Sequence, residues 1–213
     1  LYLFVFIGNS TSNAGSYDDF IAAVTFDQPQ TIEKLLARGF DPNTINEKGV
    51  PGLLLALQSE AKKAAWVLAQ HPKTNLNVET ANGETPLMLA AIQNQIELCQ
   101  LLIDRGADVN RPGWTPLHYA ATRGHREAIR LLLEHDAYID SESAQGVTPL
   151  MMAARYGSPL SVKLLLEEGA DPTLADSNNA TALDWAASAD HPQSVFYIKA
   201  FTEAWQIQNP TVD

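Results

Sequence analysis

The sequence has a single cysteine, Cys99. One cysteine excludes an internal disulfide framework and any zinc site built from several cysteines. The chain also has no His-Glu-x-x-His motif, no Gly-x-Ser-x-Gly motif and no glycine-rich phosphate-binding loop. These are local patterns by which metalloproteases, hydrolases and nucleotide-binding proteins are identified. We therefore expect no catalytic residues, no metal and no cofactor, and we expect Cys99, in ELCQLL, to be a small core residue.

Positive charge is scarce. The 14 Lys and Arg residues stand against 25 Asp and Glu residues, which gives a formal net charge of −11. This charge repels nucleic acid and anionic membrane surfaces and favours another protein, in particular a basic one, as the partner. Six aspartates at predicted helix ends and turns would form an acidic rim that attracts such a protein: Asp104, Asp108, Asp136, Asp140, Asp171 and Asp176.

A long apolar run is also missing, because LYLFVFI at residues 1–7 is too short to span a bilayer. Small residues follow this run and end in Ser12-Asn13-Ala14. This order is typical of the end of a secretory signal, so residues 1–15 are interpreted as a signal-peptide remnant or a disordered segment. The expected location is periplasmic or secreted, with the cytoplasm as the alternative, and N-terminal sequencing of the mature protein decides between them.

One pattern recurs along the chain. ETPLMLAA returns as WTPLHYAA, as VTPLMMAA and, in weaker form, as ATALDWAA, so that Thr85, Thr115, Thr148 and Thr181 are spaced by 30, 33 and 33 residues. A second series has nearly the same period: Leu35, Leu68, Leu102, Leu132 and Leu165. Two series in one register indicate a stack of similar structural units.

Each unit reads as two antiparallel helices followed by a turn. Threonine before proline predicts the start of the first helix, because the hydroxyl can cap free amides and proline at the first position loses no hydrogen bond. These pairs are Thr85-Pro86, Thr115-Pro116 and Thr148-Pro149. Glycine after the leucine series, at Gly106 and Gly169, predicts the end of the second helix.

The sequence TPLHYA at Thr115, repeated with a period near 33, resembles the ankyrin repeat. The resemblance implies an all-α ankyrin-repeat solenoid with protruding turns and a structural, hydrogen-bonding role for His118. Six units are expected, followed by a tail at 209–213: 16–44 as the N-terminal cap, 45–78, 79–110, 111–140, 141–173, and 174–208 as the C-terminal cap. Two departures stand out, since Pro51 replaces the capping threonine in the second unit and the turn before Trp114 is shortened.

Stacked repeats of this kind bind through a concave surface made of first helices and turn tips. On that surface we expect Trp114, Arg123, Arg155 and Tyr156 to form the main contact patch, because Trp, Tyr and Arg are enriched at binding hot spots. Gln93 and Glu84 are further candidates. The competing interpretation is structural: Trp114 caps a loop and Tyr156 packs between repeats.

The expected function is non-catalytic protein binding by a monomer. Three biological roles compete: a scaffold for a cell-envelope protein, an immunity-type inhibitor that neutralises a toxin or effector, and a secreted effector directed at a host.

Overall fold

The computed structural model of the protein describes residues 10–208 and divides into two compact units, one up to Pro86 and one from Leu87. The first unit holds α1 (Ser10–Thr25), α2 (Pro29–Ala37), α3 (Gly52–Gln58) and α4 (Lys62–Gln70). The second is reached through α5 (Pro86–Ile92) and continues with α6 (Ile96–Asp104), α7 (Pro116–Arg123), α8 (Arg126–Glu134), α9 (Pro149–Tyr156), α10 (Pro159–Glu167), α11 (Ala182–Ser188) and α12 (Pro192–Gln208). The only β-type backbone pairing within residues 10–208 consists of two isolated antiparallel bridges, Ile45 with Pro51 and Ala175 with Thr181. This architecture confirms the predicted all-α class.

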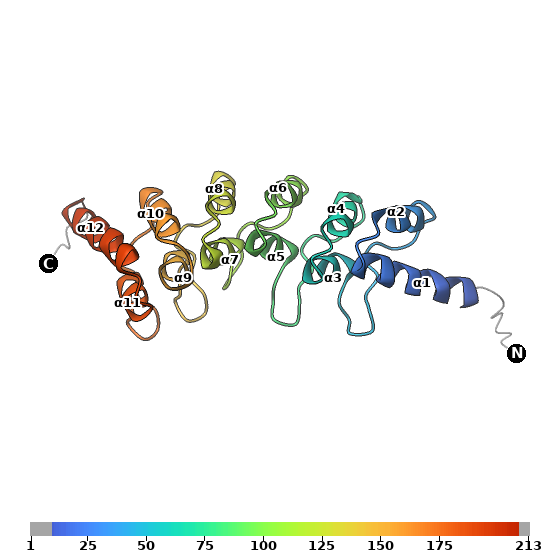
Figure 1. Ribbon diagram of the computed structural model, residues 1–213, viewed down its shortest axis with the longest axis horizontal. Coiled ribbons are helices and arrows are strands. Elements are labelled where there is room, and N and C mark those ends of the chain that lie inside the picture. Colours follow the sequence, from blue (N-terminus) through green and yellow to red (C-terminus); the bar gives the residue numbers. More distant parts are fainter. Residues whose placement is uncertain (1–9, 209–213) are drawn as a thin grey trace, which may run out of the picture. The chain divides into compact units, whose positions relative to one another are not determined.

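The first unit consists of two helix pairs. In it α1 packs on α2 and α3 packs on α4, while α1 also contacts α3 and α2 contacts α4 (Figure 1). Phe20, Leu53 and Leu54 are fully buried in its core, and the ring of Phe20 lies 4.9 Å from that of Phe40.

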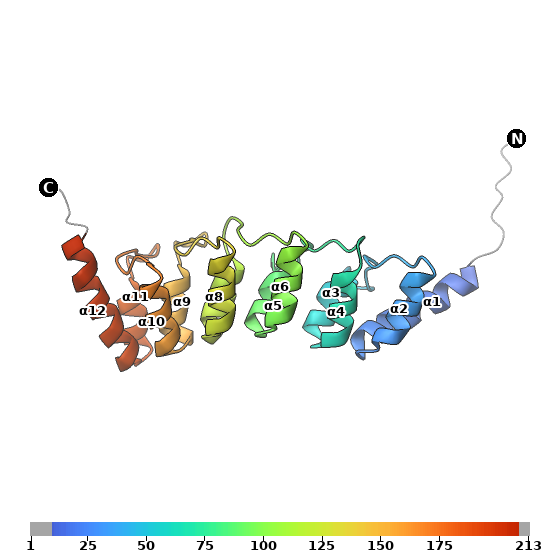
Figure 2. The same ribbon diagram turned by 90° about the horizontal axis from the view of Figure 1, so that it is seen from above.

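The second unit repeats the helix pair along the chain. The first helices α7, α9 and α11 contact one another in order, and the second helices α6, α8, α10 and α12 do the same in a parallel layer. The turns that follow the second helices emerge along one edge of this unit (Figure 2). The paired alanines of the repeat are fully buried: Ala90, Ala91, Ala120, Ala121, Ala153 and Ala154. Side chains this small allow neighbouring helices to approach closely.

The start of α9 confirms the signal in the sequence, and at α7 the Thr115 hydroxyl lies 2.9 Å from the Nδ1 atom of His118. Thr148 Oγ1 accepts a hydrogen bond from the backbone N–H of Met151, and proline occupies the first turn of both α7 and α9. At α3 the capping position is Pro51, whose side chain makes no capping hydrogen bond. The predicted departure of the second repeat is therefore present.

The helix ends also follow the prediction. Gly106 after α6 has φ +89° and Gly169 after α10 has φ +98°. This left-handed conformation suits glycine, which has no Cβ to clash with the following carbonyl group.

Each of the six ranges expected for a repeat contains one helix pair. The first helix departs from its expected boundary, since α1 begins at Ser10 and not after residue 15, so residues 10–15 are helical. The remainder of the expected signal remnant, residues 1–9, and the tail at 209–213 lie outside the described residues. No helix within residues 10–208 combines the length and the apolar character needed to cross a membrane.

Cys99 is a core residue, as expected. Its side chain is fully buried in α6, and burial raises the pKa of its thiol to about 12. The thiol therefore stays protonated at neutral pH.

The closest backbone approach that we identify involves Gly157, at the end of α9. A Cβ added there would lie 2.5 Å from the carbonyl oxygen of Ala121 in α7. We predict that Gly157→Ala lowers the free energy of unfolding by about 2–3 kcal/mol, because the methyl group would clash with the Ala121 carbonyl in α7 and with the Ala153 backbone in α9. Urea unfolding followed by circular dichroism measures this loss.

Gly15→Ala is the matched control for this experiment. It adds the same methyl group to a helix where no heavy atom lies within 4 Å, and it should not destabilise the protein. Equal stability of the two variants would contradict the close approach of α7 and α9.

Candidate functional site

The candidate site lies on the second unit, where hydrogen bonds between successive repeats fix the first helices. His118 is fully buried, and its Nδ1 lies 3.2 Å from the backbone nitrogen of Thr115. Because that N–H donates to Nδ1, the ring hydrogen resides on Nε2, which donates to the carbonyl oxygen of Val147 at 2.9 Å. His118 thus joins the fourth repeat to the turn before α9, in agreement with the structural role that the resemblance implied.

Two other histidines make similar links. His125 Nε2 lies 3.0 Å from the carbonyl oxygen of Ile92, and His191 Nδ1 lies 2.9 Å from that of Ala154. His135 instead contacts Gln100 of the preceding second helix. These histidines have separate partners, and the described part of the chain contains no group of three or more His, Cys, Asp or Glu side chains that could hold a metal ion.

A further set of links runs along the turns. Asn110 donates from Nδ2 to the carbonyl oxygen of Asp136 at 2.7 Å and accepts from the backbone N–H of Tyr138 at 2.8 Å. Asp140, one repeat later, only accepts, from the backbone N–H of Asp171. Burial raises the pKa of Asp140, and the neighbouring Asp171 carboxylate adds to that effect.

A group of side chains on α9 and α11, of which only Trp185 is half-buried and the others are exposed, is called here the Arg155 cluster: Arg155, Tyr156, Trp185 and Ser188. The Arg155 guanidinium carbon lies 5.4 Å from the Tyr156 ring centroid and 5.6 Å from that of Trp185. Arg155 Nη1 lies 3.5 Å from Ser188 Oγ. A guanidinium near aromatic faces is attracted by the quadrupole of each ring, whose face is electron-rich.

Asp176 orients the indole in this cluster. Trp185 Nε1 donates to Asp176 Oδ2 at 3.1 Å, and Asp176 Oδ1 accepts from the backbone N–H groups of Asn178 and Ala180. These hydrogen bonds, led by that of Ala180, lower the pKa of Asp176. The carboxylate therefore stays charged while it fixes both the turn and the ring.

The structure brings Arg155 and Tyr156 together but places Trp114 elsewhere. Trp114 precedes α7, whereas Arg123 ends it, and a helix of this length spans about 12 Å. Arg123 lies at the C-terminal end of α7, and Arg155 and Tyr156 lie at the C-terminal end of α9. The two helices pack against each other. The four residues expected as one patch thus occupy two ends of the first helices.

The competing structural interpretation fits one of the two aromatic residues. Trp114 is 38% exposed, and its ring meets the ring of His118 edge-on at 5.1 Å, so part of it does cover the start of α7. Tyr156 is 55% exposed and contacts Arg155, so it does not pack between repeats.

The remaining candidates are engaged locally. Gln93 is half-buried and accepts a hydrogen bond from Gln95, and Glu84, in the first unit, accepts one from Thr80 Oγ1 at 3.2 Å. The acidic rim is smaller than expected. Asp104, Asp108 and Asp136 are exposed, Asp140 and Asp171 are partly buried, and the side chain of Asp176 is only 7% exposed.

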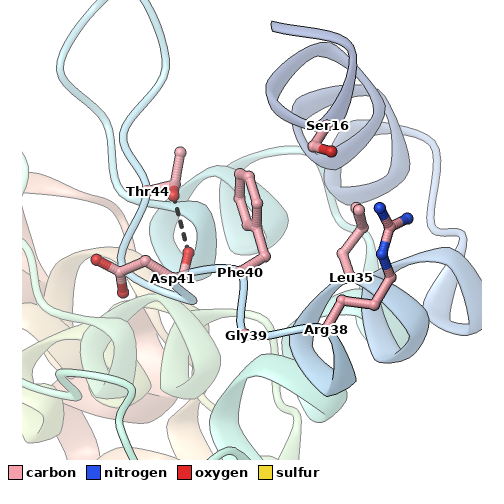
Figure 3. Close-up of a pocket in the computed structure, with 7 residues that line it drawn as sticks. All are labelled: Ser16, Leu35, Arg38, Gly39, Phe40, Asp41 and Thr44. Carbon is pink, nitrogen blue, oxygen red and sulfur yellow. Dashed lines mark hydrogen bonds between the residues drawn. The ribbon is translucent and has the colours of Figure 1, made fainter. Parts of the chain in front are cut away.

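The first unit has a pocket that sequence reasoning missed, with a volume of about 360 Å³. Figure 3 shows Phe40 at its centre, with Asp41 and Thr44 on one side and Arg38 and Ser16 on the other. Thr44 Oγ1 donates to the carbonyl oxygen of Asp41 at 2.8 Å, which stabilises the turn. The polar side chains in its lining are those of Ser16, Arg38, Asp41 and Thr44.

Known proteins resemble the chain over most of its length. A family model described as "Ankyrin repeats (3 copies)" matches residues 20–112, 109–176 and 140–202. The ankyrin repeat and SAM domain-containing protein 6 of Rattus norvegicus is 33% identical over 109 residues, which cover 49% of this chain and 12% of that protein. The chain thus spans about a tenth of the length of that relative.

Two solved structures show the same arrangement of helices. The human ASB11 ankyrin repeat domain superposes with a TM-score of 0.76 and 27% identity, over 85% of this chain and 82% of that one. A chain in the complex of the predatory endopeptidase Bd0816 of Bdellovibrio bacteriovorus with the immunity protein Bd3460 gives a TM-score of 0.72 and 26% identity. That match covers 85% of this chain and 97% of the other.

The buried His118 gives the fold a defined dependence on pH. Burial lowers its pKa from the ordinary 6.5 to about 4, so between these values the unfolded chain binds the extra proton. His118 therefore contributes its full stabilisation above pH 6.5, and that contribution falls, by on the order of 3 kcal/mol in total, as the pH drops to 4. Urea unfolding of the wild type and of His118→Gln across this range measures the contribution.

The difference in unfolding free energy between the two proteins should be largest above pH 6.5 and should shrink toward pH 4. His118→Gln keeps one donor and one acceptor without a titrating ring, so it isolates the protonation. Parallel pH curves for the two proteins would rule out a neutral buried ring.

Proposed function

The chain belongs to the ankyrin-repeat family, and from this premise we propose that it is a non-catalytic module that binds a partner protein through its first helices and turn tips. Ankyrin repeats are protein-interaction modules. The observation that carries the proposal here is the Arg155 cluster, where an arginine and two aromatic side chains lie together on the surface of adjacent first helices. These residue types dominate binding energy in protein interfaces.

The surface is organised before any partner arrives. The carboxylate of Asp176 holds Trp185, and the cluster itself holds Arg155. Side chains that are already ordered lose less conformational entropy on binding, which leaves more of the contact energy for affinity. Arg123 lies at the matching end of the neighbouring first helix α7, whereas Trp114 lies at the opposite end of α7.

The histidines support a binding role over a catalytic one. A general acid or base must reach a reacting group, but His118 is buried and both of its nitrogens have partners within the repeat stack. His125 and His191 likewise use ring nitrogens to join repeats.

We predict that replacing Trp114, Arg123, Arg155 and Tyr156 together by alanine abolishes partner capture without loss of helical content. Arg123, Arg155 and Tyr156 are exposed, and Trp114 is 38% exposed, so their removal should leave the buried core intact. Affinity capture from a native extract, followed by mass spectrometry, identifies the protein retained by the wild type, and its affinity for the purified quadruple variant should fall at least about a hundredfold.

The matched control replaces Arg130, Leu160, Lys163 and Phe196 by alanine. This variant also removes two positive charges and two exposed apolar side chains, but from the second helices α8, α10 and α12. It should bind like the wild type, and equal losses in both variants would contradict the proposed surface.

The association rate should fall as the salt concentration rises if a basic region of the partner faces Asp104, Asp108 and Asp136.

A second candidate is an immunity-type inhibitor. It is supported by the likeness to a chain of the endopeptidase–immunity protein complex, which extends over 97% of that chain. An inhibitor of this kind would cover the active site of a partner enzyme with the same first-helix surface.

For this candidate we predict that the captured partner is an enzyme whose activity falls linearly with added chain and reaches zero at one equivalent. The quadruple alanine variant should leave the activity unchanged. A partner that keeps full activity in the saturated complex would refute the inhibitor and leave a scaffold.

A further inference from the structure

The Arg155 cluster also specifies the chemistry of what it binds. We propose that Arg155 is the anchor for the carboxylate of an Asp or Glu side chain on the partner protein, with Tyr156 and Trp185 as its aromatic walls. This inference rests on the proposed function, because it assigns a contact within that same surface.

The first step is the geometry of the guanidinium. Its carbon lies over the Tyr156 ring at 5.4 Å and over the Trp185 ring at 5.6 Å. Aromatic rings are weak hydrogen-bond acceptors, so these contacts leave the guanidinium N–H groups able to donate elsewhere. One of them, on Nη1, lies 3.5 Å from Ser188 Oγ, and the guanidinium has further donors in a fixed planar fork. A carboxylate matches that fork with two parallel hydrogen bonds.

The second step is the absence of an internal counter-ion. The chain has 25 Asp and Glu residues, yet Arg155 forms no salt bridge with any carboxylate in the described part of the chain. Asp176, which is close through Trp185, uses its oxygens on the indole N–H and on two backbone N–H groups. The nearby carboxylate therefore orients the ring and leaves the positive charge of Arg155 available.

The third step separates a protein carboxylate from other anions. A nucleic acid or an anionic membrane brings many negative charges close to a chain of net charge −11, and that repulsion opposes one favourable contact. A single acidic side chain on a neutral or basic protein avoids this cost. Apolar rings beside the ion pair also exclude water, which strengthens the attraction between the two charges.

Arginine and not lysine is required at this position. The lysine ammonium is a compact, strongly hydrated charge that cannot offer two parallel donors in a planar fork. Arg155→Lys should thus retain the positive charge but no longer bind the carboxylate of the partner.

The experiment uses N-acetyl-glutamate methylamide as the probe and follows the arginine Nε–H resonances of the whole chain by NMR. The Arg155 resonance should shift and saturate at a probe concentration at least about fivefold below that needed at Arg130, an exposed arginine on α8. The neutral N-acetyl-glutamine methylamide should shift neither resonance at the same concentrations. Inorganic phosphate tests the other anion at matched ionic strength.

Tyr156→Leu probes the aromatic wall without removing the guanidinium. The Tyr156 side chain is 55% exposed, so this variant should fold, and its Arg155 resonance should respond to glutamate no better than that of Arg130. Arg155→Lys, assayed for the captured partner, should weaken binding almost as much as Arg155→Ala.

Three results would overturn the inference: equal saturation at Arg155 and Arg130, tighter saturation by phosphate than by glutamate, or full partner binding by Arg155→Lys. None of them bears on whether the chain captures a partner through the first-helix surface. Conversely, a quadruple alanine variant that still binds its partner refutes that surface even if Arg155 takes glutamate.

Discussion

Close approach between successive first helices is the constraint on which the second unit depends. Ala120, Ala121, Ala153 and Ala154 are fully buried, and the backbone at Gly157 leaves no room for a methyl group beside Ala121. Helices this close can exchange hydrogen bonds through single side chains that bridge two repeats. Arg155 and Tyr156 lie at the C-terminal end of α9, where both are exposed and neither is part of the buried interface.

The bridging side chains are mostly neutral, which suits their partly buried positions. His118 has no charge at neutral pH, because burial lowers its pKa to about 4. Asn110 satisfies one carbonyl and one N–H of the next turn, whereas Asp140 in the equivalent position satisfies only an N–H. Burial raises the pKa of Asp140, so part of its hydrogen-bond energy offsets the cost of burying its charge. The link formed by Asp140 is therefore expected to be weaker than that formed by Asn110.

The sequence predicted the fold in detail because its signals are local. Threonine before proline starts α7 and α9, and glycine follows α6 and α10, since each residue acts within one turn of its own helix. The Arg155 cluster was only half predicted, because Trp185 comes from the next repeat. The period contains a signal for it: Trp185 is one period of 33 residues after Met152, which lies three positions before Arg155 on the same helix face. The burial of Asp176 had no such signal, since it depends on where the indole of Trp185 lies.

A single oriented arginine on an acidic surface imposes two conditions on a partner. The exposed carboxylates of Asp104, Asp108 and Asp136 favour a protein that is basic over a broad area, because charge acts at the distance of the Debye length. The Arg155 cluster favours an acidic group at one point, because the guanidinium fork acts only in contact. A protein that meets the first condition alone would approach and then leave Arg155 unpaired, and a protein that meets the second alone would lack the long-range attraction that brings it to the surface. Specificity then arises from the combination, since each requirement rejects the proteins that the other would accept.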